Sequence, residues 1–258
     1  MIRHDGGVVA YANFASFYDQ IMGDRTSDIE RIKAYIKGYQ PSAGSLLELG
    51  CGTGVMLAGL AGDMTVTGVD LSPQMLAVAA ETVPGASLVE ADITSFALGA
   101  RFDVVICVFD TLNHLPRFSS WLELFDRVHE HLAESGLFVF DVNTVGRLRR
   151  LWRGPAFAED FGPNTVVMDV TPAGGDLSIW DVRIFERLSD DQFRLHHESI
   201  PELGVPLHRI RAALAENFEL LEQADLDDGA ATDESNRVFF ACRHRGAGSA
   251  APLTGGAE

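Results

Sequence analysis

Cysteine is scarce in this chain of 258 residues. Its three cysteines, Cys51, Cys107 and Cys242, are an odd number and lack the paired spacing of a metal site. This count argues against a disulfide framework and suits a reducing compartment. Cys51 falls among glycines and Cys107 in an apolar run, so we expect both to be small buried residues rather than nucleophiles.

Long apolar runs are also missing. No stretch approaches the roughly 18 residues that a membrane-spanning helix needs. The N-terminal segment has no apolar core of the kind that signal peptides carry. We therefore expect a cytoplasmic protein with no membrane partner.

Basic residues are few: 20 Lys and Arg stand against 37 Asp and Glu, a formal net charge of −17. Such a surface repels polyanions unless basic side chains are concentrated in one place. One cluster exists, Arg147, Arg149, Arg150 and Arg153, and a solvated helix face is the favoured interpretation over a phosphate site. Nucleic-acid substrates are therefore disfavoured.

Several catalytic signatures are absent from the sequence. It contains no Cys-x-x-Cys, no His-Glu-x-x-His and no Gly-x-Ser-x-Gly. His129 and His131 are two residues apart on an expected helix and would point to different faces. No metal site is expected from these patterns.

The strongest positive signal is a buried strand that runs into Gly50, Gly52 and Gly54. Glycines at alternate positions allow a sharp turn, and the helix that follows directs its free N–H groups toward a ligand. A dinucleotide fingerprint would place its third glycine at position 55, which is Val55. Asp70 ends the next apolar strand and can accept both hydroxyls of a ribose. The pocket therefore suits a nucleoside without a pyrophosphate.

Three motifs together resemble the class I S-adenosylmethionine-dependent methyltransferases. They are Glu48-Leu-Gly50-Cys-Gly52-Thr-Gly54, Asp70-Leu-Ser72-Pro and Glu90-Ala-Asp92, and the likeness spans roughly residues 10–145. It implies that S-adenosyl-L-methionine is the cofactor, that Asp92 binds the adenine amino group and that Tyr18 covers the methionyl end. The implied cofactor-binding residues are Tyr18, Glu48, Gly50, Cys51, Gly52, Gly54, Asp70, Leu71, Met75, Ala91, Asp92, Ile93 and Val108.

The alternation of strands and helices predicts an α/β fold, a doubly wound, mostly parallel, Rossmann-like sheet of seven strands. After the fifth strand, residues 161–199 alternate in polarity and predict a three-stranded antiparallel insert. We assign 1–146 to a lid and cofactor-binding core, 147–203 to a substrate cap, 204–245 to a final helix and closing strands, and 246–258 to a disordered tail. Such a cap resembles those of the sugar-amine and glycine-type N-methyltransferases.

Chemistry is expected where the fourth strand, residues 102–108, delivers its last residues to the carboxyl edge of the sheet. His114 is the candidate general base, since an ordinary histidine is largely neutral at working pH; a structural histidine is the alternative. Asp110 is a second candidate base, or it holds a substrate ammonium. Further candidates for substrate contact are Phe109, Asn113, His196 and His197.

These residues predict methyl transfer to an N or O atom of a small-molecule acceptor by in-line displacement. A non-catalytic S-adenosylmethionine-binding or regulatory protein is the alternative that the sequence leaves open. Val55 disfavours an NAD-linked oxidoreductase, and the net charge disfavours a tRNA methyltransferase. A homodimer remains open beside a monomer.

Overall fold

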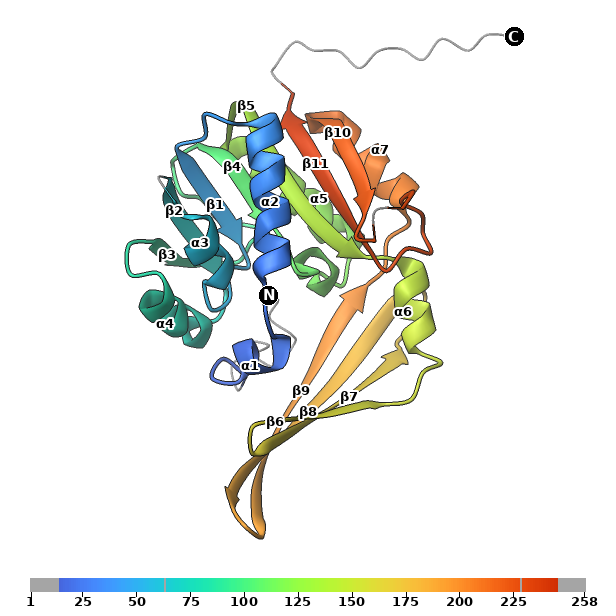
Figure 1. The fold of residues 1–258 in the computed structure, drawn as a ribbon. Helices are drawn as coiled ribbons and strands as arrows, with labels where there is room; N and C mark the ends of the chain where they lie inside the picture. The colour runs from blue at the N-terminus through green and yellow to red at the C-terminus, as the bar shows by residue number, and fades with distance from the viewer. Residues whose placement is uncertain (1–13, 63, 228, 246–258) are drawn as a thin grey trace, which may run out of the picture.

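The computed structural model describes residues 14–62, 64–227 and 229–245, which form two sheets. The larger has seven strands, and five neighbouring strands in it run parallel (Figure 1). β11 pairs antiparallel with β5, and β10 antiparallel with β11. The spatial order is β10 (Phe218–Asp225), β11 (Arg237–His244), β5 (Leu132–Asn143), β4 (Phe102–Cys107), β1 (Ser45–Leu49), β2 (Thr65–Asp70) and β3 (Ser87–Glu90). The predicted sheet and its closing antiparallel pair are confirmed.

Helices cover both faces of this sheet. One apolar cluster joins β1 and β4 to α2 and α3, and the other joins β4 and β5 to α5 and α7. The described helices are α1 (Tyr18–Met22), α2 (Thr26–Tyr39), α3 (Val55–Leu60), α4 (Pro73–Thr82), α5 (Phe118–His131), α6 (Val145–Leu151) and α7 (Leu207–Asn217), with the 3₁₀ helix η1 (Thr111–His114). Burial from both sides explains why β4 reads as a continuous apolar run.

The strand order places the glycine turn after β1 beside the segment 109–114 after β4. β1 and β4 are neighbours, and the connections that leave them run to opposite halves of the sheet. A doubly wound sheet binds ligands at such a switch point, outside the carboxyl ends of its strands. The glycine turn after β1 and the segment 109–114 after β4 both lie there.

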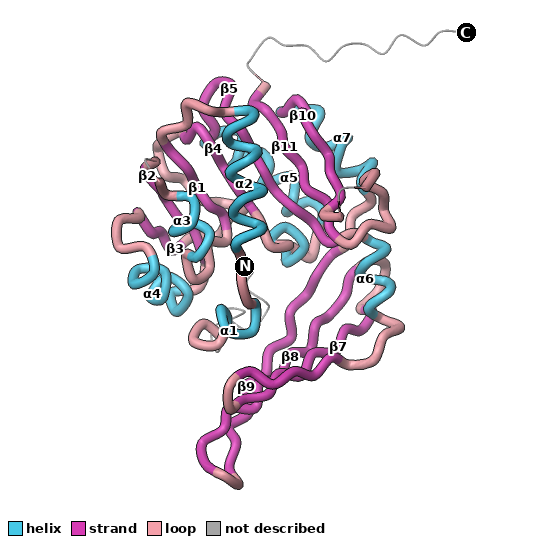
Figure 2. The backbone as a smooth tube through the Cα atoms, viewed as in Figure 1, coloured by secondary structure: helices cyan, strands magenta, loops and turns pink. Residues whose placement is uncertain are grey.

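The insert is a separate antiparallel sheet of four strands, one more than the sequence analysis predicted (Figure 2). The order is β6 (Phe157–Phe161), β7 (Asn164–Pro172), β8 (Leu177–Ser189) and β9 (Gln192–Leu203). Strand β6 escaped prediction because it is short, exposed over most of its length and acidic at its centre. It pairs only with β7 and forms the edge of the sheet.

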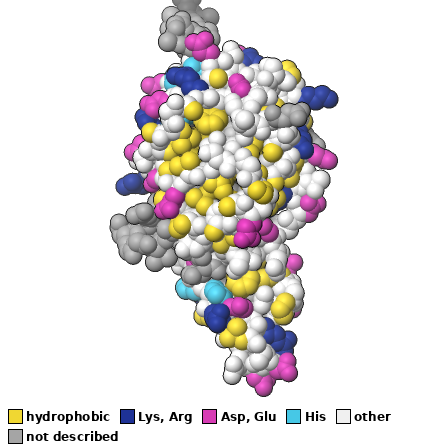
Figure 3. Space-filling model, turned by 90° about the vertical axis from the view of Figure 1, so that its left-hand side faces the viewer, with side chains coloured by type: hydrophobic (Ala, Val, Ile, Leu, Met, Phe, Trp, Pro, Cys, Tyr) yellow, Lys and Arg dark blue, Asp and Glu magenta, His cyan; other side chains and the backbone are white. Residues whose placement is uncertain are grey.

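One face of the insert packs against the part of the molecule that contains the end of β2 and the start of α4. Val166, Val182 and Ile184 join a buried cluster with Leu71 and Met75. The far end of the insert projects beyond the rest of the protein and carries charged side chains at its tip (Figure 3). The insert is therefore anchored at its base, next to the switch point.

The predicted disordered tail, residues 246–258, lies outside the described residues. Within the described ranges, every helix is too short or too polar to cross a membrane.

Candidate functional site

The three glycines of the turn after β1 all adopt the left-handed conformation. Their φ angles are 72° at Gly50, 52° at Gly52 and 79° at Gly54, values that residues with a Cβ rarely adopt. At Gly54 an added Cβ would also come within 3.1 Å of Ala79 and Val83 on the α4 side. The glycines are therefore required both by the turn and by the close packing of α3 against α4.

Asp70 holds this turn in place. Its carboxylate accepts a hydrogen bond from the Gly52 amide at 2.9 Å and another from the Ser72 amide at 2.8 Å, and the residue is 1% exposed. Each carboxylate oxygen can accept more than one hydrogen bond. Asp70 can therefore shape the glycine turn and still accept the hydroxyls of a ribose.

Glu48 is a buried carboxyl group below the same turn. Its Oε2 atom has no hydrogen-bond partner within the described structure. Burial, followed by the charge of Asp70, raises the pKa of Glu48 well above its ordinary value. A buried oxygen without a partner, next to a glycine cradle, fits a site that is completed by a polar ligand.

Two small cavities lie along the glycine turn, with volumes of about 60 Å³ and about 30 Å³. Tyr18, Gly50, Gly52 and Phe109 line both of them. The larger is also lined by the predicted residues Glu48, Cys51 and Val108, and the smaller by Asp70, Met75 and His114. The structure thus brings together most of the predicted cofactor residues, and α1 closes over them. The donors, acceptors and glycine backbone fit S-adenosylmethionine.

The remaining predicted cofactor residues lie outside the linings of these two cavities. Gly54 packs on α4, and Leu71 joins the apolar cluster beneath the insert. Ala91 and Ile93 pack in the core next to β3. Asp92 accepts hydrogen bonds from the amide and hydroxyl of Thr94 and so caps a turn. Its contact with adenine stays a prediction.

The segment after β4 contains two strained residues. Phe109 and Asp110 have φ angles of 57° and 50°, a conformation that is costly for residues with a Cβ. The Asp141 carboxylate accepts hydrogen bonds from both amides, at 3.0 Å and 2.8 Å, and is 1% exposed. Asp141 thereby fixes the direction in which the Asp110 side chain leaves the backbone.

A larger cavity of about 260 Å³ opens between the seven-stranded sheet and the insert. Tyr18 and Phe109 line this cavity and also both small cavities. They therefore lie between the larger cavity and the two small ones. The insert contributes apolar side chains, among them Trp180 and Ile200. The polar lining residues are Arg25, Asp110, Asn143, Arg147, Glu202 and Arg237. A small acceptor fits here, beside the predicted cofactor pocket.

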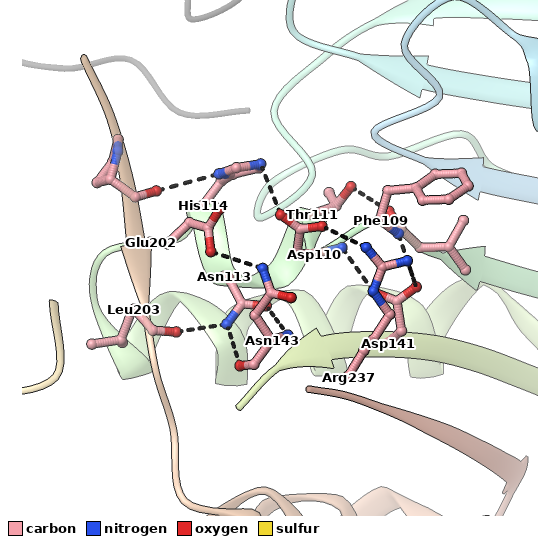
Figure 4. Close-up of polar contacts among 12 residues, drawn as sticks. Phe109, Asp110, Thr111, Asn113, His114, Asp141, Asn143, Glu202, Leu203 and Arg237 are labelled. Carbon is pink, nitrogen blue, oxygen red and sulfur yellow. Dashed lines mark hydrogen bonds and ion pairs between the residues drawn. The ribbon is translucent and has the colours of Figure 1, made fainter. Parts of the chain in front are cut away.

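Three titratable side chains meet at the border of these cavities (Figure 4). The ligand atoms of Asp110, His114 and Glu202 all lie within 4.8 Å of one another. His114 Nδ1 is 3.3 Å from the Pro201 carbonyl oxygen, and Nε2 is 3.9 Å from Asp110 Oδ2. A carbonyl only accepts hydrogen bonds, so Nδ1 carries the proton in the neutral ring and Nε2 is the basic nitrogen.

The electrostatic surroundings assign different states to these three groups. Burial lowers the pKa of His114, with partial opposition from Asp110, so the ring is neutral. Burial acts to raise the pKa of Asp110, but Arg237, His114 and Arg147 together hold it below the usual value. Burial and the charge of Asp110 raise the pKa of Glu202 well above its usual value. The site holds an ionised and a protonated carboxyl group beside a neutral imidazole.

Asn113 has a structural role in the described chain. Its amide group donates to the carbonyl oxygens of Asn143 and Leu203 and accepts from the Asn143 amide, each at 2.9 Å. These bonds join η1 to β5 and to the end of β9. Contact between Asn113 and a substrate is therefore less favoured than the sequence suggested.

The two histidines of the insert face opposite sides, as their alternation predicts. His196 is half-buried and lies 2.9 Å from Glu186 Oε2, whereas His197 is exposed and lies 2.7 Å from Asp181 Oδ2. Neither residue is part of the described lining of the 260 Å³ cavity. Substrate contact by either one stays a prediction that the geometry does not support.

The arginine cluster divides its side chains between surface and site. Arg149 pairs with Asp176, and Arg150 pairs with Glu234, which agrees with the predicted solvated helix face. Arg147 instead lines the 260 Å³ cavity.

Sequence reasoning missed Glu202, Arg237, Arg25 and Trp180. Glu202 lies on β9, Arg237 on β11, Arg25 just before α2 and Trp180 on β8, all far from the recognised motifs. For Glu202 and Arg237 the sequence does offer one signal, since each is a charged residue within an otherwise apolar strand end. It offers none for Arg25 and Trp180.

Comparison with known proteins identifies the core. Residues 46–136 match the family model described as "Methyltransferase domain". A Geobacillus sp. (strain WCH70) protein that is provisionally named a methyltransferase is 28% identical over 246 residues, covering 91% of this chain and 100% of that protein. A Streptomyces fradiae protein, dTDP-3-amino-3,6-dideoxy-alpha-D-glucopyranose N,N-dimethyltransferase, is 32% identical over 166 residues, covering 62% of this chain and 60% of that protein.

The architecture also has solved counterparts. The crystal structure of an S-adenosylmethionine-dependent methyltransferase from Clostridium acetobutylicum matches with a TM-score of 0.82 at 22% identity, covering 92% of this chain and 100% of that chain. Because this match extends over nearly the whole chain, the insert is part of the shared fold.

Proposed function

We propose that this chain, whose residues 46–136 match a methyltransferase domain, is a class I S-adenosylmethionine-dependent methyltransferase that methylates an N or O atom of a small molecule held between the sheet and the insert. The observation that carries the proposal is the 260 Å³ cavity, which shares Tyr18 and Phe109 with the cofactor pocket. Ligand sites of this kind are concave, mostly apolar and marked by a few convergent polar groups.

Bound S-adenosylmethionine supplies an electrophilic methyl group on a sulfonium, so the protein contributes positioning and electrostatics. Glu48, Asp70 and the glycine turn hold the nucleoside side of the site. Tyr18 and α1 cover the border with the acceptor cavity and exclude water from it. Alignment of two reactants accounts for up to about 7–11 kcal/mol of a barrier.

His114 and Asp110 act on the acceptor. The neutral imidazole has its basic nitrogen on the Asp110 side, where it can take a proton from an acceptor N–H or O–H group. Such general-base assistance typically adds about 100- to 10,000-fold in rate. The ionised Asp110 stabilises the positive charge that the imidazole or an amine acceptor then carries.

The acceptor class follows from charge and from the relatives. A net charge of −17 disfavours a nucleic acid. The name of the Streptomyces fradiae relative specifies an amino-sugar nucleotide as that enzyme's substrate, and this supports an amino sugar here.

The test is the formation of S-adenosylhomocysteine with a panel of amino sugars and amino-sugar nucleotides. Turnover is expected for at least one class of acceptor. Tight binding of S-adenosylmethionine without turnover on any acceptor would favour the non-catalytic alternative.

A further inference from the structure

Two carboxyl groups face each other where the two sheets meet. Asp110 follows β4 of the seven-stranded sheet, and Glu202 lies near the end of β9 in the insert. Both line the 260 Å³ cavity, and their closest oxygens lie within 4.8 Å (Figure 4). An acceptor that fills this cavity therefore lies against both groups.

The two carboxyl groups are close enough for one proton to relieve their repulsion. Glu202 is 3% exposed, and its carboxyl oxygen lies within 4.8 Å of the Asp110 carboxyl oxygen. Two ionised carboxylates at this distance would repel each other, so the more buried one keeps its proton and donates it to the other. A cation of the right size can take the place of that proton.

Asn143 supplies an independent sign of what the ligand carries. It is 2% exposed, and its Nδ2 donates to Glu202 Oε2 at 2.9 Å. Its Oδ1 is buried and finds no partner among the residues that the structure describes, although Asn143 lines the same cavity. An amide oxygen only accepts hydrogen bonds, so a hydrogen-bond donor is its complement.

We propose that Asp110, Glu202 and Asn143 form the subsite for the acceptor's amine, which binds as an ammonium in place of the proton shared by the two carboxyl groups. An ammonium offers three donors, which match the three acceptor groups. The inference rests on the proposed function and narrows it from an N or O acceptor to an amine.

The exchange balances in protons and charge. The ammonium enters with all of its protons, the O–H bond of Glu202 breaks, and that proton leaves for solvent. Two carboxylates then surround one cation. His114 Nε2, on the Asp110 side, accepts the proton that the amine must lose before its lone pair is available for methylation.

A divalent metal ion is the competing occupant, since two carboxylates and an imidazole are suitable ligands. Two guanidinium groups already compensate the carboxylates. Arg237 Nη2 lies 3.4 Å from Asp110 Oδ1, and the charge of Arg147 acts on both Asp110 and Glu202. A singly charged ammonium therefore suits this subsite better than a divalent ion.

The experiment is calorimetry on the full chain loaded with S-adenosylhomocysteine. The probes are amino sugars, each paired with the sugar that has a hydroxyl in place of the amine, titrated below neutral pH in buffers of different ionisation enthalpy. We expect each bound amine to release about one proton, and to bind at least roughly tenfold more tightly than its hydroxyl counterpart.

Glu202→Gln keeps the hydrogen bond from Asn143 but cannot release a proton. It should abolish proton release and weaken amine binding roughly tenfold, while the hydroxyl counterparts bind as before. Glu198→Gln is the matched control, because Glu198 is a buried carboxyl on the same strand, 6% exposed and outside the described lining of the cavity. It should leave both measurements unchanged.

Equal binding of amines and hydroxyl sugars, or amine binding without proton release, would overturn the proposal. So would Mg²⁺ binding that Glu202→Gln removes. Methylation of hydroxyl sugars without preference for amines would overturn the subsite but leave methyl transfer standing. Amine-selective binding with proton release but no S-adenosylhomocysteine production would support the subsite and count against the proposed reaction.

Discussion

Replacing Asp141 by asparagine tests whether the strained turn after β4 orients the reacting groups. The Asp141 carboxylate accepts hydrogen bonds from the amides of Phe109 and Asp110, both of which have positive φ angles. An asparagine has one carbonyl oxygen and can keep only one of these bonds. Its NH₂ group then faces the second buried amide, which is left without an acceptor.

The expected loss of stability follows from these two bonds. A hydrogen bond to a charged acceptor contributes about 1.5–3 kcal/mol, and an unsatisfied buried amide costs about 1–3 kcal/mol. Because these contributions overlap, we expect Asp141→Asn to lower the free energy of unfolding by about 2–4 kcal/mol. Urea denaturation with linear extrapolation measures this change.

The functional effect should exceed the effect on stability. Strained positive-φ residues persist only while the surrounding structure holds them, so the turn should relax and shift the Asp110 side chain. A displacement of about 1 Å in a reacting group can cost roughly 100-fold in rate. We expect a loss of that size in kcat, measured at a temperature and concentration where the variant is fully folded.

Asp103→Asn is the matched control for this variant. The Asp103 carboxylate also accepts two backbone amides, those of Gly44 at 2.9 Å and Ser45 at 3.0 Å, but near the start of β1. Both amides bond to the same oxygen, Oδ2, which an asparagine carbonyl can replace, so this variant should lose less stability than Asp141→Asn and keep its kcat. Equal kcat losses in the two variants, or none in Asp141→Asn, would refute the positioning role.

Three further predictions concern the cofactor, the base and the cap. Asp70→Ala removes the ribose acceptor and the anchor of Gly52, so calorimetry should show S-adenosylmethionine binding at least about 100-fold weaker, with Asp103→Ala unaffected. His114→Gln should lower kcat about 100- to 10,000-fold; since burial lowers the pKa of His114, kcat of the unmodified enzyme should be lost only as pH falls below the ordinary histidine range. Trp180→Ala should raise KM for the acceptor several-fold and spare cofactor affinity, because Trp180 lines only the acceptor cavity among the three described.

The cofactor half of the site was accessible to sequence reasoning because its parts are local. Gly50, Gly52 and Gly54 occupy every second position of one short segment, and their positive φ angles are ones that only glycine adopts readily. Asp70 follows at the end of the next strand, so one crossover places it beside the turn. Periodicity and spacing were sufficient for both.

The acceptor half depends on contacts between distant segments. Glu202 is one charged residue on an alternating strand, and no pattern in the residues around it predicts that it lies close to Asp110. The two carboxyl groups meet because the insert packs against Leu71 and Met75 and the end of β9 bonds to Asn113 and Asn143. The same reason explains why His196 and His197 attracted attention: their residue type suggested chemistry, but β-strand geometry directs them to Glu186 and Asp181.

The last residues of β9 couple the cap to the reacting segment. The Pro201 carbonyl lies 3.3 Å from His114 Nδ1, the Glu202 carboxyl lies within 4.8 Å of Asp110, and the Leu203 carbonyl accepts from Asn113. Three consecutive residues of the insert thus lie against the 109–114 segment, and β8 pairs with the same stretch of β9. An acceptor that displaces Trp180 or Ile200 on these strands therefore acts on the backbone that orients His114. Strand β9 both lines the acceptor cavity and holds His114. Changes in the sequence of the cap should therefore alter kcat as well as KM.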